Sequence, residues 1–138
     1  MMEGVPPFPS RRPTLRPLAI LCIAFLLLGC GQKSAKPVSY REQIQPILNA
    51  KCAECHGAAR TQGKIDLTSY ENLMKARTVK GKKPVVIAGD PSKSWLYILS
   101  ATDQPHYGMP PDTSTVVPLR KEDLLLVSKW IQEGAKDN

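Results

Sequence analysis

The chain has 138 residues, a length that fits one domain with additional segments, and a formal net charge of +7 at pH 7. Only two Phe, two Trp and four Tyr supply aromatic bulk, so we expect a bound group to contribute to packing. No segment shows sustained alternation of apolar and polar residues, and no internal repeat is present. These features disfavour a mainly β fold and a repeat architecture, and they predict an all-α domain with long loops.

The N-terminal segment has the pattern of an export signal. Arginines precede an apolar run at 18–28, which is shorter than the about 20 residues of a membrane span. The run ends in LLGC at Cys30, which resembles the lipobox of bacterial lipoproteins. We expect residues 1–29 to be a lipoprotein signal peptide and Cys30 to carry the lipid of an exported, periplasmic, membrane-anchored protein. The alternatives are an ordinary secretory signal and an uncleaved anchor. Export also disfavours nucleic acid as a partner.

A flexible tether and a helix follow the signal. Residues 30–39 are rich in Gly, Ser, Lys and Pro, a composition typical of flexible tethers. We expect the folded domain to cover residues 40–138. Its first helix is predicted from about Tyr40 to His56, interrupted or restarted near Pro46, because proline is tolerated in the first turn of a helix.

The end of this helix contains the sequence Cys52-Ala53-Glu54-Cys55-His56. The spacing C-x-x-C-H is that of haem attachment in c-type cytochromes. Residues three and four apart lie on one face of a helix, so the two thiols and the imidazole would point the same way. Each thiol would bond to a vinyl group of the porphyrin, and His56 would bind the iron.

Two other interpretations of this motif are less favoured. A zinc site would need four ligands in a tetrahedron, and the exported chain offers only the three motif side chains and His106. A thioredoxin-like redox pair would need a neighbouring βαβ pattern, which the sequence lacks. A disulfide framework is also excluded, because Cys22 lies in the signal and Cys30 is the expected lipidation site.

The middle of the chain contains two predicted helices and a basic run. The sequence Thr68-Ser69-Tyr70-Glu71 matches a capping box that opens a helix to about Arg77. Asp90 followed by Pro91 predicts the start of a third helix, to about Ala101. The basic run between them predicts a docking surface for an acidic redox protein, although a solvated loop and a contact with anionic lipid headgroups are alternatives. Its residues are Lys75, Arg77, Lys80, Lys82 and Lys83.

A second axial ligand is expected opposite His56, and methionine in this position raises the potential of cytochromes c. Met109 lies in the sequence Gly-Met-Pro-Pro, which favours an extended loop able to present its side chain. Met74 lies in a helical segment, where methionine is more often part of the core. His106, or an open or water-ligated position, is the alternative to Met109.

The last helix is predicted from about Lys121 to Glu133, and Gly134 is placed to end it. Its apolar face is expected to include Leu124, Leu125 and Val127, together with Trp130 and Ile131.

Short motifs follow one another in a consistent order between about Tyr40 and Ala135: IQPIL, KCAECHG, GKIDL, VIAGDP followed by SWLY, MPP and WIQEGA. In this order they resemble the planctomycete-type cytochrome c domain. The resemblance implies a class I cytochrome c fold of about four helices, whose first and last helices cross near one covalently bound haem c. It further implies attachment through Cys52 and Cys55, with His56 as the proximal and Met109 as the distal iron ligand.

Two positions depart from the family pattern. Ala88 stands where proline is common, and Arg120 stands where Ser or Thr usually caps the last helix. The second difference predicts a frayed start of that helix. Neither position bears on the ligands of the iron.

Taken together, the sequence predicts a mono-haem cytochrome that carries single electrons between redox proteins, in the periplasm or at the outer side of the cytoplasmic membrane. It predicts no enzymatic activity and no small-molecule substrate. A haem-based sensor or a small peroxidase with an open distal site is the alternative.

Overall fold

The computed structural model describes residues 36–104 and 106–138. The expected signal peptide and Cys30 therefore lie outside the described residues. Within those two ranges, no helix combines the length and the apolar character needed to cross a membrane. Four α-helices occur in them together with three short helical turns and one two-stranded sheet. In chain order they are η1 (Tyr40–Ile44), α2 (Gln45–Lys51), β1 (His56–Gly57), β2 (Arg60–Thr61), η2 (Gln62–Lys64), α3 (Tyr70–Lys75), η3 (Pro91–Lys93), α4 (Trp95–Ala101) and α5 (Lys121–Gln132).

The first helix is shorter than predicted. It begins as the π-helical turn η1, continues as α2 with Pro46 in its first turn, and ends at Lys51 rather than at His56. The backbone N–H groups of Cys52 and Ala53 both donate to the carbonyl of Leu48, so regular helical pairing stops there.

The two strands were not predicted from the sequence. Strands β1 and β2 pair antiparallel and have two residues each, so they are too short to show an alternation of apolar and polar residues.

Helix α3 begins one residue later than the predicted capping box. Its N-cap is Ser69, whose hydroxyl accepts a hydrogen bond from the backbone N–H of Asn72. The hydroxyl of Thr68 instead donates to the carboxylate of Asp66, 2.6 Å away. Asp66 also accepts a bond from the Asn72 side chain, so the local network favours Ser69 as the cap.

Helix α5 differs from the prediction at two points. Its start is not frayed, because the carboxylate of Asp123 accepts hydrogen bonds from the backbone N–H and the guanidinium of Arg120. These bonds make up half of a capping box. Leu125 is not part of the buried face, since 69% of it is exposed, whereas Val127, Trp130 and Ile131 are buried. The helix ends at Gln132, and Gly134 follows with a φ of +98°.

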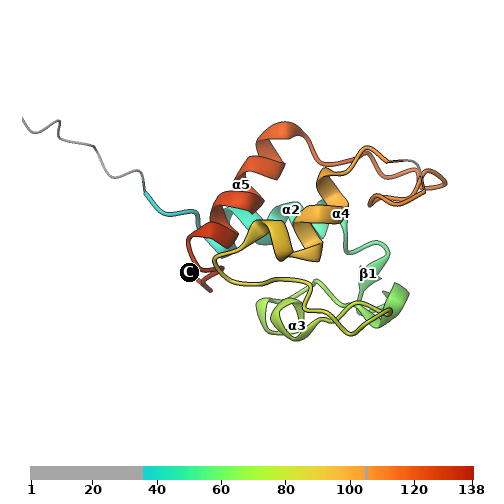
Figure 1. The fold of residues 1–138 in the computed structure, drawn as a ribbon, viewed down its shortest axis with the longest axis horizontal. Coiled ribbons are helices and arrows are strands. Elements are labelled where there is room, and N and C mark those ends of the chain that lie inside the picture. The colour runs from blue at the N-terminus through green and yellow to red at the C-terminus, as the bar shows by residue number, and fades with distance from the viewer. Residues whose placement is uncertain (1–35, 105) are drawn as a thin grey trace, which may run out of the picture. The chain divides into compact units, whose positions relative to one another are not determined.

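An aromatic cluster organises the core. Tyr40 lies edge-on to Tyr70, with ring centroids 5.1 Å apart, and 5.4 Å from the ring of Trp130. Helix α5 packs against η1, η3 and α4, and Figure 1 shows α3 on the other side of the domain from α5. The core also includes Ile44, Leu48, Leu67, Leu73, Val85, Val86, Leu96, Val127, Ile131 and Ala135.

The first and last described segments are joined by hydrogen bonds. The side chain of Asn138 accepts a bond from the backbone N–H of Tyr40 and donates one to the carbonyl of Val38. The N–H of Val38 donates to the carboxylate of Glu133 over 2.7 Å. Val38, which the sequence places in the tether, is thus buried as part of the folded unit. We refer to this contact between residues 38–41 and 133–138 as the terminal clasp.

Candidate functional site

The cysteine motif forms a tight turn directly after α2. The N–H of His56 donates to the carbonyl of Cys52 over 2.8 Å, and the N–H of Cys55 donates to the same carbonyl. Gly57 closes this turn. A Cβ atom at Gly57 would lie 2.4 Å from the carbonyl oxygen of Ala53, so this close approach of two backbone segments requires glycine.

The short hairpin that follows orients the imidazole. The carbonyl of Cys55 accepts a hydrogen bond from the N–H of Gln62, which brings β2 and η2 back to the motif. The Nδ1 atom of His56 lies 3.0 Å from the carbonyl oxygen of Gln62. A backbone carbonyl can only accept, so Nδ1 is the donor of this bond. In the neutral imidazole, Nε2 then has the free lone pair with which it can bind a metal.

Two adjacent cavities meet at the motif. The empty space in them, open solvent included, is about 490 Å³ in one and about 480 Å³ in the other. The first extends toward Pro110, Val117 and Leu119, and the second toward Val85, Trp95 and Leu99. We call the two cavities together the crevice. Four residues line both of them: Cys52, His56, Ser100 and Met109.

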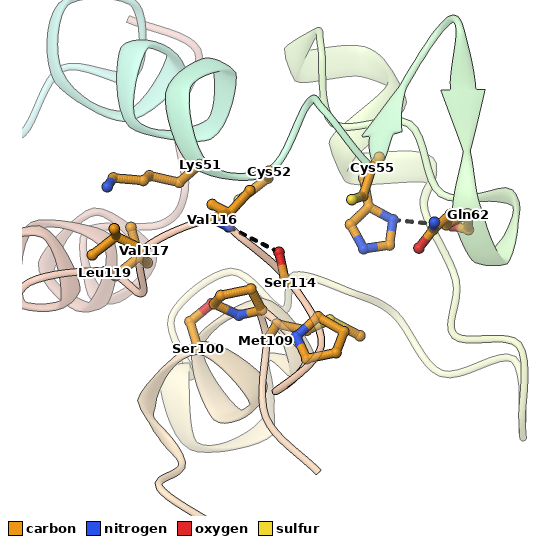
Figure 2. Close-up of a pocket in the computed structure, with 13 residues that line it drawn as sticks. Lys51, Cys52, Cys55, Gln62, Ser100, Met109, Ser114, Val116, Val117 and Leu119 are labelled. Atoms are coloured by element: carbon orange, nitrogen blue, oxygen red, sulfur yellow. Dashed lines mark hydrogen bonds between the residues drawn. The ribbon is translucent and has the colours of Figure 1, made fainter. Parts of the chain in front are cut away.

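Met109 lies across the crevice from the motif. Figure 2 shows Cys52 and Cys55 along one side of the pocket and Met109 with Ser100 along the other. The N–H of Met109 donates to the carbonyl of Leu99 over 2.8 Å, which ties this loop to α4. Gly108 permits the approach, because a Cβ atom there would lie 3.1 Å from the carbonyl oxygen of Thr102. The structure thus places the four residues that the sequence singled out around one cavity: Cys52, Cys55, His56 and Met109.

The two alternative ligands lie elsewhere. The side chain of His106 is 88% exposed, and its Nδ1 is 3.1 Å from the carboxylate of Asp112. His106 lines neither cavity of the crevice. Met74 lies in α3 and packs against the core, as its helical surroundings predicted. Neither residue is placed to compete with Met109.

The chemistry of the crevice suits a large apolar group better than a bare metal ion. No three His, Cys, Asp or Glu side chains within residues 36–104 and 106–138 are placed to hold a metal ion, so the zinc interpretation has no ligand set there. Cys52 and Cys55 are free thiols. Burial, and to a smaller extent the neighbouring Cys55, raises the pKa of the Cys52 thiol to about 11. The Cys52 thiol is therefore protonated and uncharged at neutral pH.

Several lining residues were not predicted as part of the site. Trp95 and Ser100 were assigned only to a helix, yet both line the crevice. The loop that contains Val116 and Val117 also forms part of it, although it belongs to no helix or strand. The feature of the sequence that could have indicated this loop is the pair of adjacent valines in an otherwise polar segment.

One family model matches part of the chain. Residues 52–113 match the family model described as Planctomycete cytochrome C. Residues 52–113 are thus similar to a planctomycete cytochrome c domain. The match begins at the first cysteine of the motif and includes Met109, and it confirms the resemblance found in the sequence. No curated protein and no solved structure matched the chain. A cytochrome c domain is, in general, that of a haem-binding electron carrier.

Proposed function

We propose that this protein is a mono-haem c-type cytochrome that carries single electrons between redox proteins. The observation that carries the proposal is the crevice itself. Cys52, Cys55, His56 and Met109 all line it, with the two cysteines on one side and Met109 on the other. One haem c would occupy both cavities. When bound, its iron supplies one-electron chemistry by alternating between the ferrous and ferric states.

Each residue of the site has a distinct role in this proposal. The sulfur atoms of Cys52 and Cys55 would hold the porphyrin through thioether bonds. His56 would bind the iron through Nε2, since Nδ1 is engaged with the carbonyl of Gln62. Met109, which lines the same crevice, would be the second ligand and would raise the reduction potential. Apolar side chains such as Leu99 and Val85 would exclude water from the porphyrin.

The proposal extends to the fold and the location of the protein. The packing of α5 on η1 supports the class I arrangement, in which the first and last helices meet near the haem. The apolar run and the LLGC sequence before Gly31 support export and a lipid anchor on Cys30, with the domain in the periplasm or at the outer side of the cytoplasmic membrane.

Absorption spectra of the protein, expressed together with a cytochrome c maturation system, test the proposal. We expect covalently bound haem, a low-spin reduced spectrum with split bands, and in the oxidised form the weak far-red band of iron–methionine ligation. A high-spin spectrum that changes on addition of carbon monoxide would favour a gas sensor or a peroxidase instead. A purified protein without haem would refute the proposal altogether.

A further inference from the structure

A shallow basic hollow lies on the outer surface of two loops. It is formed by residues from β2 to η2 and from the end of α3 to Lys82, and its lining contains no carboxylate. Lys75 forms an ion pair with Glu71. The other three cations have no ion-pair partner among the residues that the structure describes. We call this surface the basic hollow; its cations are Lys64, Lys75, Arg77 and Lys82.

The loop that displays these cations is held by its own hydrogen bonds. The N–H of Thr78 donates to the carbonyl of Lys83, and the N–H of Lys83 donates to the hydroxyl of Thr78. The same hydroxyl donates to the carbonyl of Lys80 over 2.7 Å. At the base of the loop, Arg77 pairs with Pro84 in a β-bridge. A loop that is already ordered loses little conformational entropy when a partner binds.

An exposed apolar side chain also lines the hollow. Val79 is 62% exposed, although it lies among cations. A Cβ atom at Gly63 would lie 3.2 Å from Val79, so the two loops that form the hollow touch at this point. Protein–protein interfaces combine apolar contacts with charged and polar residues at their edges, and the exposed Val79 among cations offers both kinds of contact.

The basic hollow shares its two loops with the crevice. Ile65 follows Lys64 and Thr78 precedes Val79, and both Ile65 and Thr78 line the second cavity of the crevice. The side chains of these loops thus face the cofactor cavity on one side and solvent on the other. A protein bound in the hollow would be separated from the cofactor by this one layer of chain.

We infer that the basic hollow is the docking site of an acidic redox protein. This inference rests on the proposed function, because it names the surface through which the electron passes. In the transfer, ferrous iron loses one electron and becomes ferric, and the oxidised centre of the partner gains that electron; the reverse direction uses the same surface. The cations increase the rate of encounter, and Val79 provides the contact that excludes water.

Stopped-flow reduction by an acidic flavodoxin tests this inference. The flavodoxin hydroquinone donates one electron to the ferric holoprotein. The test variant is Lys82→Glu, and the control is Lys136→Glu, which makes the same change of charge at an exposed lysine that lines neither cavity of the crevice. Lys82→Gln removes one charge instead of two. All variants are first shown to have the haem content, spectrum and potential of the original protein, so a failure of the proposed function is recognised before docking is measured.

At low ionic strength, we expect Lys82→Glu to lower the second-order rate constant about tenfold, Lys82→Gln to lower it by less, and Lys136→Glu to change it less than about twofold. At about 1 M salt, where the screening length is about 3 Å, the difference should vanish. Equal effects of Lys82→Glu and Lys136→Glu would overturn the inference, because only net charge would then matter.

Two other outcomes would also overturn the inference. If Lys82→Glu shifted the reduction potential and its pH dependence but left the salt dependence of the rate unchanged, the cations would serve the haem carboxylates. If it abolished binding to phosphatidylserine vesicles but left the flavodoxin reaction unchanged, the hollow would be a contact with the membrane.

Discussion

The two ends of this domain are packed by different means. Around Trp130, Tyr40 and Ile44, side chains of the protein fill the space, and each of these residues is at most 2% exposed. Around Met109 and Cys52, apolar side chains surround cavities instead. At the first end the side chains of the protein fill the core completely. At the second they leave space, which we propose that haem fills.

The largest effect should follow from removing both attachment cysteines. The double substitution Cys52→Ala and Cys55→Ala should abolish covalent haem and destabilise the domain by at least about 4 kcal/mol, comparable to the loss of a tightly bound ligand. Hydrogen exchange of the variant should be fast at Ser100 and Met109 and slower around Trp130. Equal loss of protection at both ends would contradict the distinction between them.

Truncating one side chain in the filled part of the core should lower the stability without changing the absorption spectrum. Trp130→Ala removes a buried ring and the bond from its indole N–H to the carbonyl of Lys136. We expect a loss of about 3–5 kcal/mol in urea unfolding, with the absorption bands of the folded protein unchanged. Leu125→Ala, at an exposed position of the same helix, is the control and should cost less than about 0.5 kcal/mol. A change in iron ligation in Trp130→Ala would show that the two ends are coupled.

Replacing Met109, the proposed distal ligand, should change the spectrum and the reduction potential more than the stability. Met109 is 39% exposed, so Met109→Ala should cost only about 1 kcal/mol of stability. The reduction potential should fall by at least about 0.1 V, since axial ligands set potentials over about 0.8 V, and the reduced protein should bind carbon monoxide. Met74→Ala is the matched control. It should leave the reduction potential unchanged, and its reduced form should not bind carbon monoxide. A potential and spectrum unchanged in Met109→Ala would exclude this residue as ligand.

The smallest effect concerns the terminal clasp at high pH. Burial, followed by the charge of Asp137 and then by Tyr70, raises the pKa of Tyr40 to about 12 from 10.0. Between these values the unfolded state has released the proton that the folded state retains, so stability falls as pH rises from 10 to 12. Tyr40→Phe loses the bond from its hydroxyl to Gln45 and about 1 kcal/mol at neutral pH.

The melting temperature of both proteins across this pH range measures the contribution. The difference in stability between the original protein and Tyr40→Phe should shrink as pH rises toward 12. A constant difference would show that the Tyr40 hydroxyl titrates alike in the folded and unfolded states.

Local patterns predicted much of the site, and contacts distant in sequence explain most of what was missed. The spacing of Cys52, Cys55 and His56 and the prolines after Met109 indicated both sides of the crevice. The terminal clasp was not predicted, because the bonds of Asn138 to Val38 and Tyr40 join residues about a hundred positions apart.

Local errors had local causes. Arginine is an unusual N-cap, but the acceptor at the start of α5 is supplied by Asp123 rather than by Arg120. At α3, both Thr68 and Ser69 are residue types that commonly cap helices. The choice between them depends on Asp66, whose carboxylate binds the hydroxyl of Thr68.

The bond between His56 and the carbonyl of Gln62 has a consequence for engineering. Because the acceptor belongs to the backbone, replacing Gln62 by any amino acid other than proline keeps both this acceptor and the backbone N–H that bonds to Cys55. The side chain of Gln62 lines the first cavity, so its polarity can be varied while the imidazole keeps its orientation. A library at this single position would therefore adjust the dielectric surroundings of the cofactor separately from the electron-donating strength of its histidine.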